Sequence, residues 1–248
     1  MAKREIGERY SGQLLGVFWA IGHPLVVMAV YVFIFGFVFK VKIAQQTNVP
    51  LDYATYLLSG LIPWMAFQES MSKASTVIVA NSNLVKQFVF PTEVLPVKGV
   101  MATVATQSIF LSLLVLYVLL TQHSLPWTYS LLPVLLVLQA LGMIGVSYVL
   151  SAIGVYVRDT KDLVQVFAVT GVYLVPAFYL PEFVPSVFSR LLYLNPFSYL
   201  IWCYQDALYF GRLQHWWAWI VLPVLSLGIF VIGYRFFRKL KLMFANVL

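Results

Sequence analysis

The sequence contains few charged residues. Only 10% of its 248 residues are Asp, Glu, Lys or Arg, and 61% are apolar, whereas a typical soluble domain is about a quarter charged and about half apolar. Because a helix needs about 20 mostly apolar residues to cross a membrane, the length allows six or seven crossings with short connections. It leaves no room for a sizeable soluble domain. We therefore expect an all-α integral membrane protein.

Cysteine is almost absent, and so are the common motifs of catalysis. Cys203 is the single cysteine, which excludes an intramolecular disulfide and any CxxC or Cys/His metal site. The sequence contains no G-x-x-x-x-G-K-[ST] phosphate loop, no H-E-x-x-H motif and no recognisable Ser/His/Asp grouping. We expect no catalytic residue, metal site or cofactor in this chain, so the energy for any uphill transport would have to come from elsewhere.

The net charge of +7 does not indicate a nucleic-acid partner. The basic residues form short clusters between apolar runs rather than one polar face. Such clusters are typical of segments that meet the surface of a membrane.

The apolar runs predict six membrane-spanning helices. Polar or turn-forming residues separate them, for example Asn81-Ser82-Asn83. The run at residues 14–39 is too long for a cleavable signal peptide, so we interpret it as part of a retained first span. The predicted helices cover residues 25–39, 53–79, 96–120, 131–157, 163–180 and 217–236.

The segment at residues 181–210 determines the topology. It is apolar enough to enter a bilayer, but it contains Glu182, Arg190 and Asp206. If it does not cross, both termini are cytoplasmic, with twelve of the sixteen basic residues on the cytoplasmic side and four outside, as the positive-inside rule requires. We therefore predict outer re-entrant helices here, and Pro181, Glu182, Asn195 and Pro196 are candidate gate residues.

The chain is expected to form one transmembrane domain over residues 1–248. Its parts are a cytoplasmic amphipathic helix at 1–18, spans one to four at 19–157, span five at 158–180, the re-entrant segment at 181–210, and span six with a basic tail at 211–248. In the first part, Ile6, Tyr10, Leu14 and Val17 share one helical face. The alternative is that this segment is only a topology signal.

A second amphipathic segment follows the second span. Leu84 and Phe88, like Val85 and Val89, are four residues apart, which predicts a short cytoplasmic helix with an apolar face. Such a face favours contact with a partner protein, and a plain interfacial helix is the alternative.

The next cytoplasmic turn, residues 158–162, carries four charges of alternating sign. Asp159 and Asp162 have the spacing of an Asp-x-x-Asp metal and diphosphate site. With Arg158 and Lys161 beside them, a salt-bridged helix start is the favoured interpretation.

Two groups of residues are candidates for a passage through the membrane. Glu69 and Lys73 are charged residues inside the second span and can pair on one helix face; snorkelling of Lys73 at the boundary is the alternative. Aromatic residues make up 17% of the chain, and Tyr31, Phe35 and Phe39 recur at helical spacing, where flat rings could line a path for sugars.

Five segments together resemble a known family. In order they are KREIGERYSGQLLGVFWAIGHPL, YLLSGLIPWMAF, NLVKQFVFPTEVLP, VRDTKDL and LLYLNPFSYLI. The same order is seen in membrane subunits of bacterial ABC exporters of the type-2 permease group, and the chain is similar to permeases for O-antigen, capsular polysaccharide and teichoic acid. The resemblance covers nearly the whole chain.

The resemblance implies a permease homodimer in the bacterial cytoplasmic membrane. Two separate ATPase subunits would bind ATP and magnesium and drive export of a polyprenyl-diphosphate-linked polysaccharide. It also implies roles for three segments: an interface helix at residues 3–17, an outer gate at 181–204, and ATPase coupling at two places. The coupling residues would be Asn83, Leu84, Val85, Lys86, Gln87, Phe88, Val89 and Phe90, with Arg158 and Asp159 at the second contact.

Two other functions stay open. The same architecture could export drugs or simple lipids. A function of another class is a membrane transferase acting on polyprenyl phosphates, in which Asp159 and Asp162 would hold a metal ion.

Overall fold

The computed structural model describes residues 19–31, 33–34, 53–86, 91–179 and 186–244. Within these ranges every regular element is a helix and there is no strand. The elements are α2 (Trp19–Tyr31), α3 (Tyr53–Ala80), α4 (Ser82–Val85), α5 (Val94–Gln122), the 3₁₀ helix η4 (Trp127–Leu131), α6 (Leu132–Tyr156), α7 (Thr160–Gly171), the 3₁₀ helix η5 (Val172–Leu174), α8 (Ser186–Leu194), α9 (Pro196–Gln205), the π-helix η7 (Asp206–Phe210) and α10 (Trp216–Lys241).

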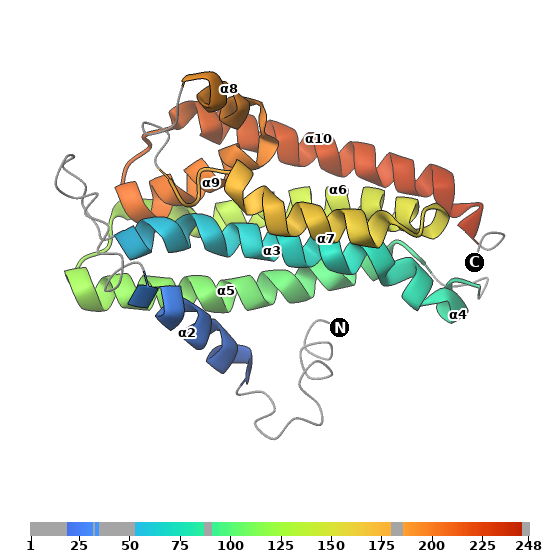
Figure 1. Ribbon diagram of the computed structural model, residues 1–248, viewed down its shortest axis with the longest axis horizontal. Coiled ribbons are helices and arrows are strands. Elements are labelled where there is room, and N and C mark those ends of the chain that lie inside the picture. Colours follow the sequence, from blue (N-terminus) through green and yellow to red (C-terminus); the bar gives the residue numbers. More distant parts are fainter. Residues whose placement is uncertain (1–18, 32, 35–52, 87–90, 180–185, 245–248) are drawn as a thin grey trace.

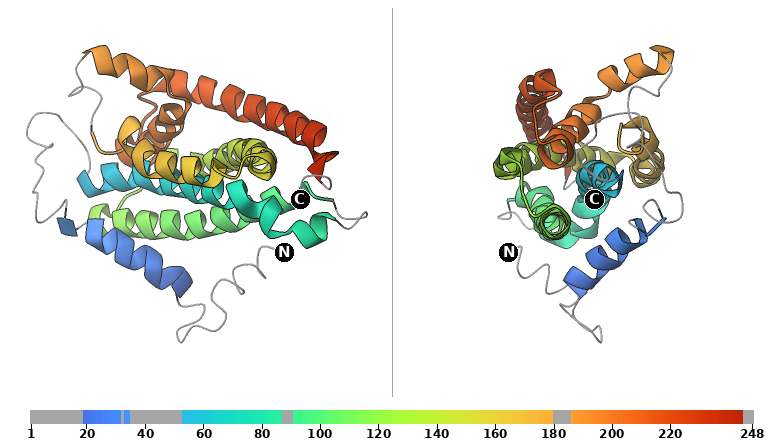
Figure 2. Two further views of the ribbon diagram at one scale, coloured as in Figure 1. Left: turned by 45° about the vertical axis from the view of Figure 1, so that its right-hand side comes forward. Right: turned by 90° about the vertical axis from the view of Figure 1, so that its left-hand side faces the viewer.

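The long helices run side by side along one axis, with α3 in the middle (Figure 1). α3 contacts α5, α6, α7 and α9, and all of its residues from Ala54 to Trp64 are buried. Figure 2 shows the other helices around it, with α2 set apart from the rest at one side. A helix surrounded in this way needs apolar or small residues on every face.

The bundle has two distinct ends (Figure 1). We call the end with α4, the α6–α7 turn and the last turn of α10 the α4 end. The opposite end, with α8, α9 and the start of α10, is the α9 end. The chain reaches the α9 end through α7 and leaves it through α10, so the residues described between them stay at that end.

Three helical stretches are long and apolar enough to cross a membrane by length and composition: Val94–Gln122, Trp127–Tyr156 and Trp216–Lys241. They match the predicted third, fourth and sixth spans. The predicted second span coincides with α3, which is 28 residues long but carries Gln68, Glu69 and Lys73. By length and composition, three of the described helical stretches are therefore candidate membrane spans.

The predicted bounds of the first and fifth spans differ from the structure. Helix α2 is present from Trp19 and continues past Pro24, whereas the predicted start was residue 25; its predicted end lies outside the described residues. The fifth helix ends with η5 at Leu174 rather than at residue 180. Val175 is extended, with φ −116° and ψ 152°, because the ring of Pro176 disfavours a helical conformation in the preceding residue.

Glycines allow α6 to pack tightly against two neighbours. A Cβ atom added to Gly233 of α10 would lie 2.2 Å from the carbonyl oxygen of Gly145 in α6, and one added to Gly154 would lie 2.2 Å from the carbonyl oxygen of Ser75 in α3. No side chain fits at such a distance, so the helix backbones touch directly, as is common between membrane helices.

Candidate functional site

An irregular segment, residues 175–179, follows η5 and is enclosed by the bundle at the α9 end. Val175 and Ala177 are fully buried. Gly60 of α3 makes room for this backbone, because a Cβ there would lie 3.0 Å from the Cα atom of Ala177. Non-helical backbone at membrane depth is tolerated only where protein satisfies its polar groups or water reaches it.

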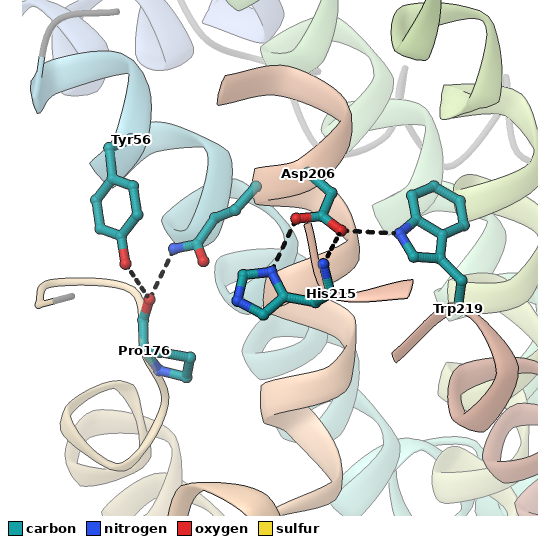
Figure 3. Close-up of polar contacts among 6 residues, drawn as sticks. Tyr56, Pro176, Asp206, His215 and Trp219 are labelled. Atoms are coloured by element: carbon teal, nitrogen blue, oxygen red, sulfur yellow. Dashed lines mark hydrogen bonds and ion pairs between the residues drawn. The ribbon is translucent and has the colours of Figure 1, made fainter. Parts of the chain in front are cut away.

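Side chains of α3 and α9 bind the carbonyl groups of this segment (Figure 3). The Gln205 Nε2 donates to the carbonyl oxygen of Pro176 at 2.7 Å. The Tyr56 hydroxyl lies 3.2 Å from that oxygen and 3.0 Å from the carbonyl oxygen of Tyr179, and the Tyr53 hydroxyl donates to the carbonyl of Phe178. The segment therefore keeps its position through bonds to side chains distant in the sequence.

A buried carboxylate joins η7, which directly follows α9, to the start of α10 (Figure 3). Asp206 is completely buried. Its Oδ1 lies 2.8 Å from His215 Nδ1, and its Oδ2 accepts the backbone N–H of His215 at 2.8 Å and the Trp219 Nε1–H at 3.2 Å. The His215 ring stacks on Trp202 with the centroids 5.5 Å apart. A carboxylate buried in this way is stabilised by its donors, so η7 and the start of α10 are held as one unit.

The π-helix η7 receives further hydrogen bonds from the 3₁₀ helix η4, which precedes α6. The hydroxyl of Thr128 donates to the carbonyl oxygen of Ala207 at 2.7 Å, and the hydroxyl of Tyr129 donates to that of Leu208 at 2.8 Å. The α9 end thus satisfies its irregular backbone with side chains from several elements.

A polar network crosses the middle of the bundle. The amide nitrogen of Gln107 in α5 donates to Gln139 Oε1 in α6 at 2.7 Å and to the Tyr204 hydroxyl in α9 at 3.1 Å. Gln139 in turn donates to the carbonyl oxygen of Pro63 in α3 at 3.0 Å. Gln107 and Gln139 are buried. The network therefore links α3, α5, α6 and α9 through hydrogen bonds in the interior of the bundle.

The predicted gate residues are described in part. Asn195 accepts the N–H of Phe197 at 3.0 Å as the N-cap of α9 and donates to the carbonyl of Leu174 at 2.9 Å, while Pro196 occupies the first helical position, which suits proline. Pro181 and Glu182 lie outside the described residues. Asn195 therefore ties the end of η5 to α9, and its role in a gate stays a prediction.

The ion pair predicted within α3 is present. Lys73 Nζ lies 3.0 Å from Glu69 Oε1, and the two side chains are 33% and 27% exposed. Lys73 also donates to the Thr103 hydroxyl of α5 at 3.4 Å. Gln68, Ser72 and Thr76 are at least partly exposed on the same helix, so a polar stripe runs along the α4 half of α3.

The predicted aromatic path falls mostly outside the described residues. Tyr31 is half-buried and packs against the main apolar core. Phe35 and Phe39 lie outside the described part of the chain, as does the predicted amphipathic helix at residues 1–18.

At the α4 end, the predicted coupling segment begins with a single short helix. α4 spans four residues, and Val85 is its one buried side chain, while Asn83, Leu84 and Lys86 are exposed. Gln87, Phe88, Val89 and Phe90 lie outside the described residues. The segment therefore presents polar and apolar side chains outward from the bundle.

The α6–α7 turn lies at the same end. Arg158 and Asp159 are exposed, and Asp159 precedes α7 without a capping hydrogen bond from its side chain. Among the described residues, no group of three or more His, Cys, Asp or Glu side chains could hold a metal ion. Asp159 and Asp162 thus have no third protein ligand within the described ranges.

The end of α10 and the residues that follow it pack at the α4 end. Phe237 and Phe244 are buried in an apolar cluster with Ile78, Val85, Leu95, Tyr148, Ala152 and Val155. The Tyr156 hydroxyl donates to the carbonyl oxygen of Leu240 at 3.1 Å. This cluster joins α3, α4, α5, α6 and α10.

An ion pair lies beside the cluster. Lys241 Nζ contacts Oε1 of Glu93, the residue that precedes α5. The side chains of Lys241 and Glu93 are 33% and 21% exposed. Partial burial raises the pKa of Glu93, but the hydrogen bond and positive charge of Lys241 outweigh this and hold the pKa below its ordinary value of 4.5. Glu93 is therefore ionised at neutral pH.

Sequence reasoning did not single out Gln107, Gln139, Asp206 and His215 as a set of interacting residues. Each lies in or beside an apolar run, and polar residues in such runs face partners or cavities. That signal marks the residues individually, but it does not reveal which of them meet.

The chain is similar to several known proteins. The O-antigen export system permease protein RfbA of Klebsiella pneumoniae is 28% identical over 255 residues, covering 100% of this chain and 93% of that protein. RfbA of Myxococcus xanthus is 27% identical over 86% of this chain and 80% of its own length. The polysialic acid transport protein KpsM of Escherichia coli is 21% identical over 95% of this chain and 90% of its own length.

The family model described as ABC-2 type transporter matches residues 1–209. This range includes α2 to α9 and the segments on which the resemblance was based. The chain is a member of the ABC-2 type transporter family.

Proposed function

We propose that this chain is the membrane-spanning subunit of an ATP-driven exporter that moves a polyprenyl-diphosphate-linked polysaccharide across the bacterial cytoplasmic membrane. The family match over residues 1–209 carries the proposal. The full-length similarity to a protein named as an O-antigen export permease supports a polysaccharide as the substrate class. The lipid link follows from the resemblance stated above.

We infer six crossings, formed by α2, α3, α5, α6, α7 with η5, and α10, with both termini in the cytoplasm. The positive-inside rule supports this orientation, because it places the α4 end and twelve of sixteen basic residues inside. The 12 residues of α7 and the 3 of η5 span only about 24 Å. The satisfied backbone of residues 175–179 would complete that crossing, and α8 and α9 would be the outer re-entrant helices.

A passage for the glycan would use the polar stripe of α3 and a second copy of the chain. Leu163, Val166, Val169 and Tyr173 on α7 are 68%, 64%, 59% and 67% exposed, so this face adjoins either lipid or another protein. A homodimer would enclose the stripe between two copies. Glu69 and Lys73 would then offer charges of both signs to a passing sugar chain.

The energy source would be a separate ATPase subunit that binds ATP and magnesium. The chain has no phosphate loop in its sequence. The ATPase would dock at the α4 end, where Asn83, Leu84, Lys86, Arg158 and Asp159 are exposed.

Depletion of the chain in its host tests the proposal. We expect lipid-linked glycan to accumulate inside the cell, the surface glycan to be lost, and an ATPase to copurify with the affinity-tagged wild-type chain. Normal surface glycan after depletion, or a chain that never associates with an ATPase, would refute the proposal. Export of small amphiphiles without an effect on glycan would favour the drug or simple-lipid alternative.

The transferase alternative is tested with the same strain. We expect Asp159→Asn and Asp162→Asn to leave the glycan chemically complete. A purified, ATPase-free chain with transferase activity that either substitution abolishes would establish the alternative.

A further inference from the structure

α10 lies at the rim of the bundle and presents an apolar face outward (Figure 2). The helix packs against α6 and α9. Its exposed residues include Ile220, Val224, Leu227 and Val231, which share one helical face because they are four, three and four residues apart. Since α10 is long and apolar enough to cross a membrane, this face fits the acyl chains of lipids.

Three basic residues continue this face at the α4 end. Arg235 and Arg238 come four and seven residues after Val231, so they lie on the same side of the helix, and the next turn adds Lys239. All three side chains are exposed. Arg235 is eleven residues after Val224, a rise of about 16 Å, which is close to half of a hydrocarbon core of about 30 Å. When the apolar face lies beside the chains of one leaflet, the basic residues therefore lie at the depth of the phosphate groups.

The positive charge of this cluster is not neutralised by acidic neighbours in the described part of the chain. The sequence after Asp206 contains no Asp or Glu, and Glu93 is bonded to Lys241. Among the described residues, the ion pairs do not include the three basic residues of the cluster. The α6–α7 turn at the same end differs, because residues 158–162 carry two basic and two acidic side chains. The end of α10 thus has an excess of positive charge that the α6–α7 turn lacks.

Tyr234 holds one guanidinium group close to the apolar part of the helix. The Cζ atom of Arg238 lies 5.8 Å from the centroid of the Tyr234 ring, which is a cation–π distance. Because Tyr234 is one turn nearer the start of α10, the guanidinium is directed back along the helix. The Tyr234 ring is itself held by Phe230, at 6.4 Å and an interplanar angle of 6°, and by Tyr148 of α6 at 5.7 Å. A guanidinium at the boundary of the membrane has little water around it, and phosphate oxygens can supply both its hydrogen-bond acceptors and its counter-charge.

We propose that Tyr234, Arg235, Arg238 and Lys239, named here the α10 lipid site, bind the phosphate of an anionic phospholipid whose acyl chains lie along the exposed apolar face of α10. The phospholipid belongs to the cytoplasmic leaflet, a placement that rests on the orientation proposed above. An anionic headgroup complements the excess positive charge of the cluster, whereas a zwitterionic headgroup brings no net charge. The ligand is therefore selected by its headgroup and oriented by its chains.

Native mass spectrometry of the purified, delipidated full-length chain tests the site. With phosphatidylglycerol and phosphatidylcholine of identical acyl chains, we expect wild type to bind one phosphatidylglycerol per chain about tenfold more tightly than phosphatidylcholine. Arg235→Gln/Arg238→Gln should reduce this preference to about twofold and leave the affinity for phosphatidylcholine unchanged. Arg158→Gln/Lys161→Gln is the matched control, since it removes two exposed basic residues at the same end of the bundle, and it should keep the full preference.

Tyr234→Leu separates a built site from a diffuse positive surface. The substitution keeps every charge but removes the ring under Arg238, and we expect the preference for phosphatidylglycerol to fall about threefold. The affinity for phosphatidylcholine again serves as the internal control for folding.

Equal affinity of wild type for the two phospholipids would overturn the proposal. So would an equal loss of preference in Arg158→Gln/Lys161→Gln, full preference in Tyr234→Leu, or displacement of phosphatidylglycerol by an equimolar amount of polyprenyl diphosphate. The assay contains neither glycan nor ATPase, so its result is independent of whether the chain exports a polysaccharide.

Discussion

At the α9 end the helices are joined by buried hydrogen bonds, whereas at the α4 end they are joined by packed aromatic rings and a partly exposed ion pair. Asp206 is completely buried and has three donor contacts, while Lys241 and Glu93 both remain partly in contact with solvent. A buried polar group is costly to leave without a partner, and a partly exposed ion pair is cheap to break. Loss of a polar contact should therefore lower the free energy of unfolding more at the α9 end than at the α4 end.

Substitution of Asp206 should give the largest effect. Asp206→Asn removes the negative charge and replaces one of the two acceptor oxygens with an NH₂ group, so the buried donors of His215 and Trp219 lose a charge-assisted partner. We expect a loss of about 3 kcal/mol in the free energy of unfolding. Denaturant unfolding in detergent measures it. Asp162→Asn, at an exposed carboxylate, is the control and should be close to neutral. Equal stability of the two variants would remove the distinction between the ends.

Truncation of Phe244 should be the most damaging change at the α4 end. Phe244→Ala leaves a space beside Phe237 and Tyr156, and we expect a loss of about 2 kcal/mol. This is less than in a central core, because Phe244 follows the end of α10 and its backbone can move into the space. Met243→Ala is the control, since Met243 is 58% exposed. If Phe244→Ala lowers the free energy of unfolding more than Asp206→Asn does in the same assay, the α4 end contributes more to stability than the α9 end.

The fold is foreseeable from the sequence where one helix is apolar over its whole length. The bounds of α5 and α6 follow from run lengths, because lipid demands an unbroken apolar segment. The predicted bounds of α3 also agree within one residue, although this helix carries Gln68, Glu69 and Lys73. The end of the fifth helix was mispredicted, although Pro176 was a local signal for it. The backbone at residues 175–179 is apolar in sequence, and its non-helical path depends on Tyr53, Tyr56 and Gln205, which are not its neighbours in the chain.

The candidate site was foreseeable to a similar extent. The pair of Glu69 and Lys73 follows from i, i+4 spacing on one helix. Asp206 and His215 meet across a turn, and Gln107 and Gln139 meet across two helices. No periodicity encodes such contacts, so they could not be predicted from a single sequence.

Loss of one hydroxyl at the α9 end should have a smaller effect. Tyr56→Phe removes the donor shared by the carbonyl groups of Pro176 and Tyr179, and we expect a loss of about 1 kcal/mol. Tyr173→Phe is the matched control because the Tyr173 side chain is 67% exposed. Thermal unfolding of the two variants, compared with wild type, provides the measurement. If both behave like wild type, the irregular segment does not depend on this bond.

The smallest expected effect is the pH dependence of the ion pair at the α4 end. Since the folded pKa of Glu93 lies below its ordinary value of 4.5, its contribution is present above pH 4.5 and is lost as the pH falls through the folded pKa. We expect wild type to exceed Glu93→Gln by less than about 1 kcal/mol at neutral pH. Unfolding of both proteins as a function of pH should show the difference disappearing in acid, and a constant difference would contradict the pairing.

The contact between glycines of α6 and α10 fixes the position of these two helices relative to each other. Because backbone touches backbone at Gly145 and Gly233, a slip of one residue would press a side chain into the opposite helix. The pair can turn or tilt as a body, but its two members cannot slide past each other. Val224 and Ile232, which are 67% and 63% exposed on α10, are therefore suitable anchor points for spectroscopic rulers, since a changed distance from them reports movement of the other helices.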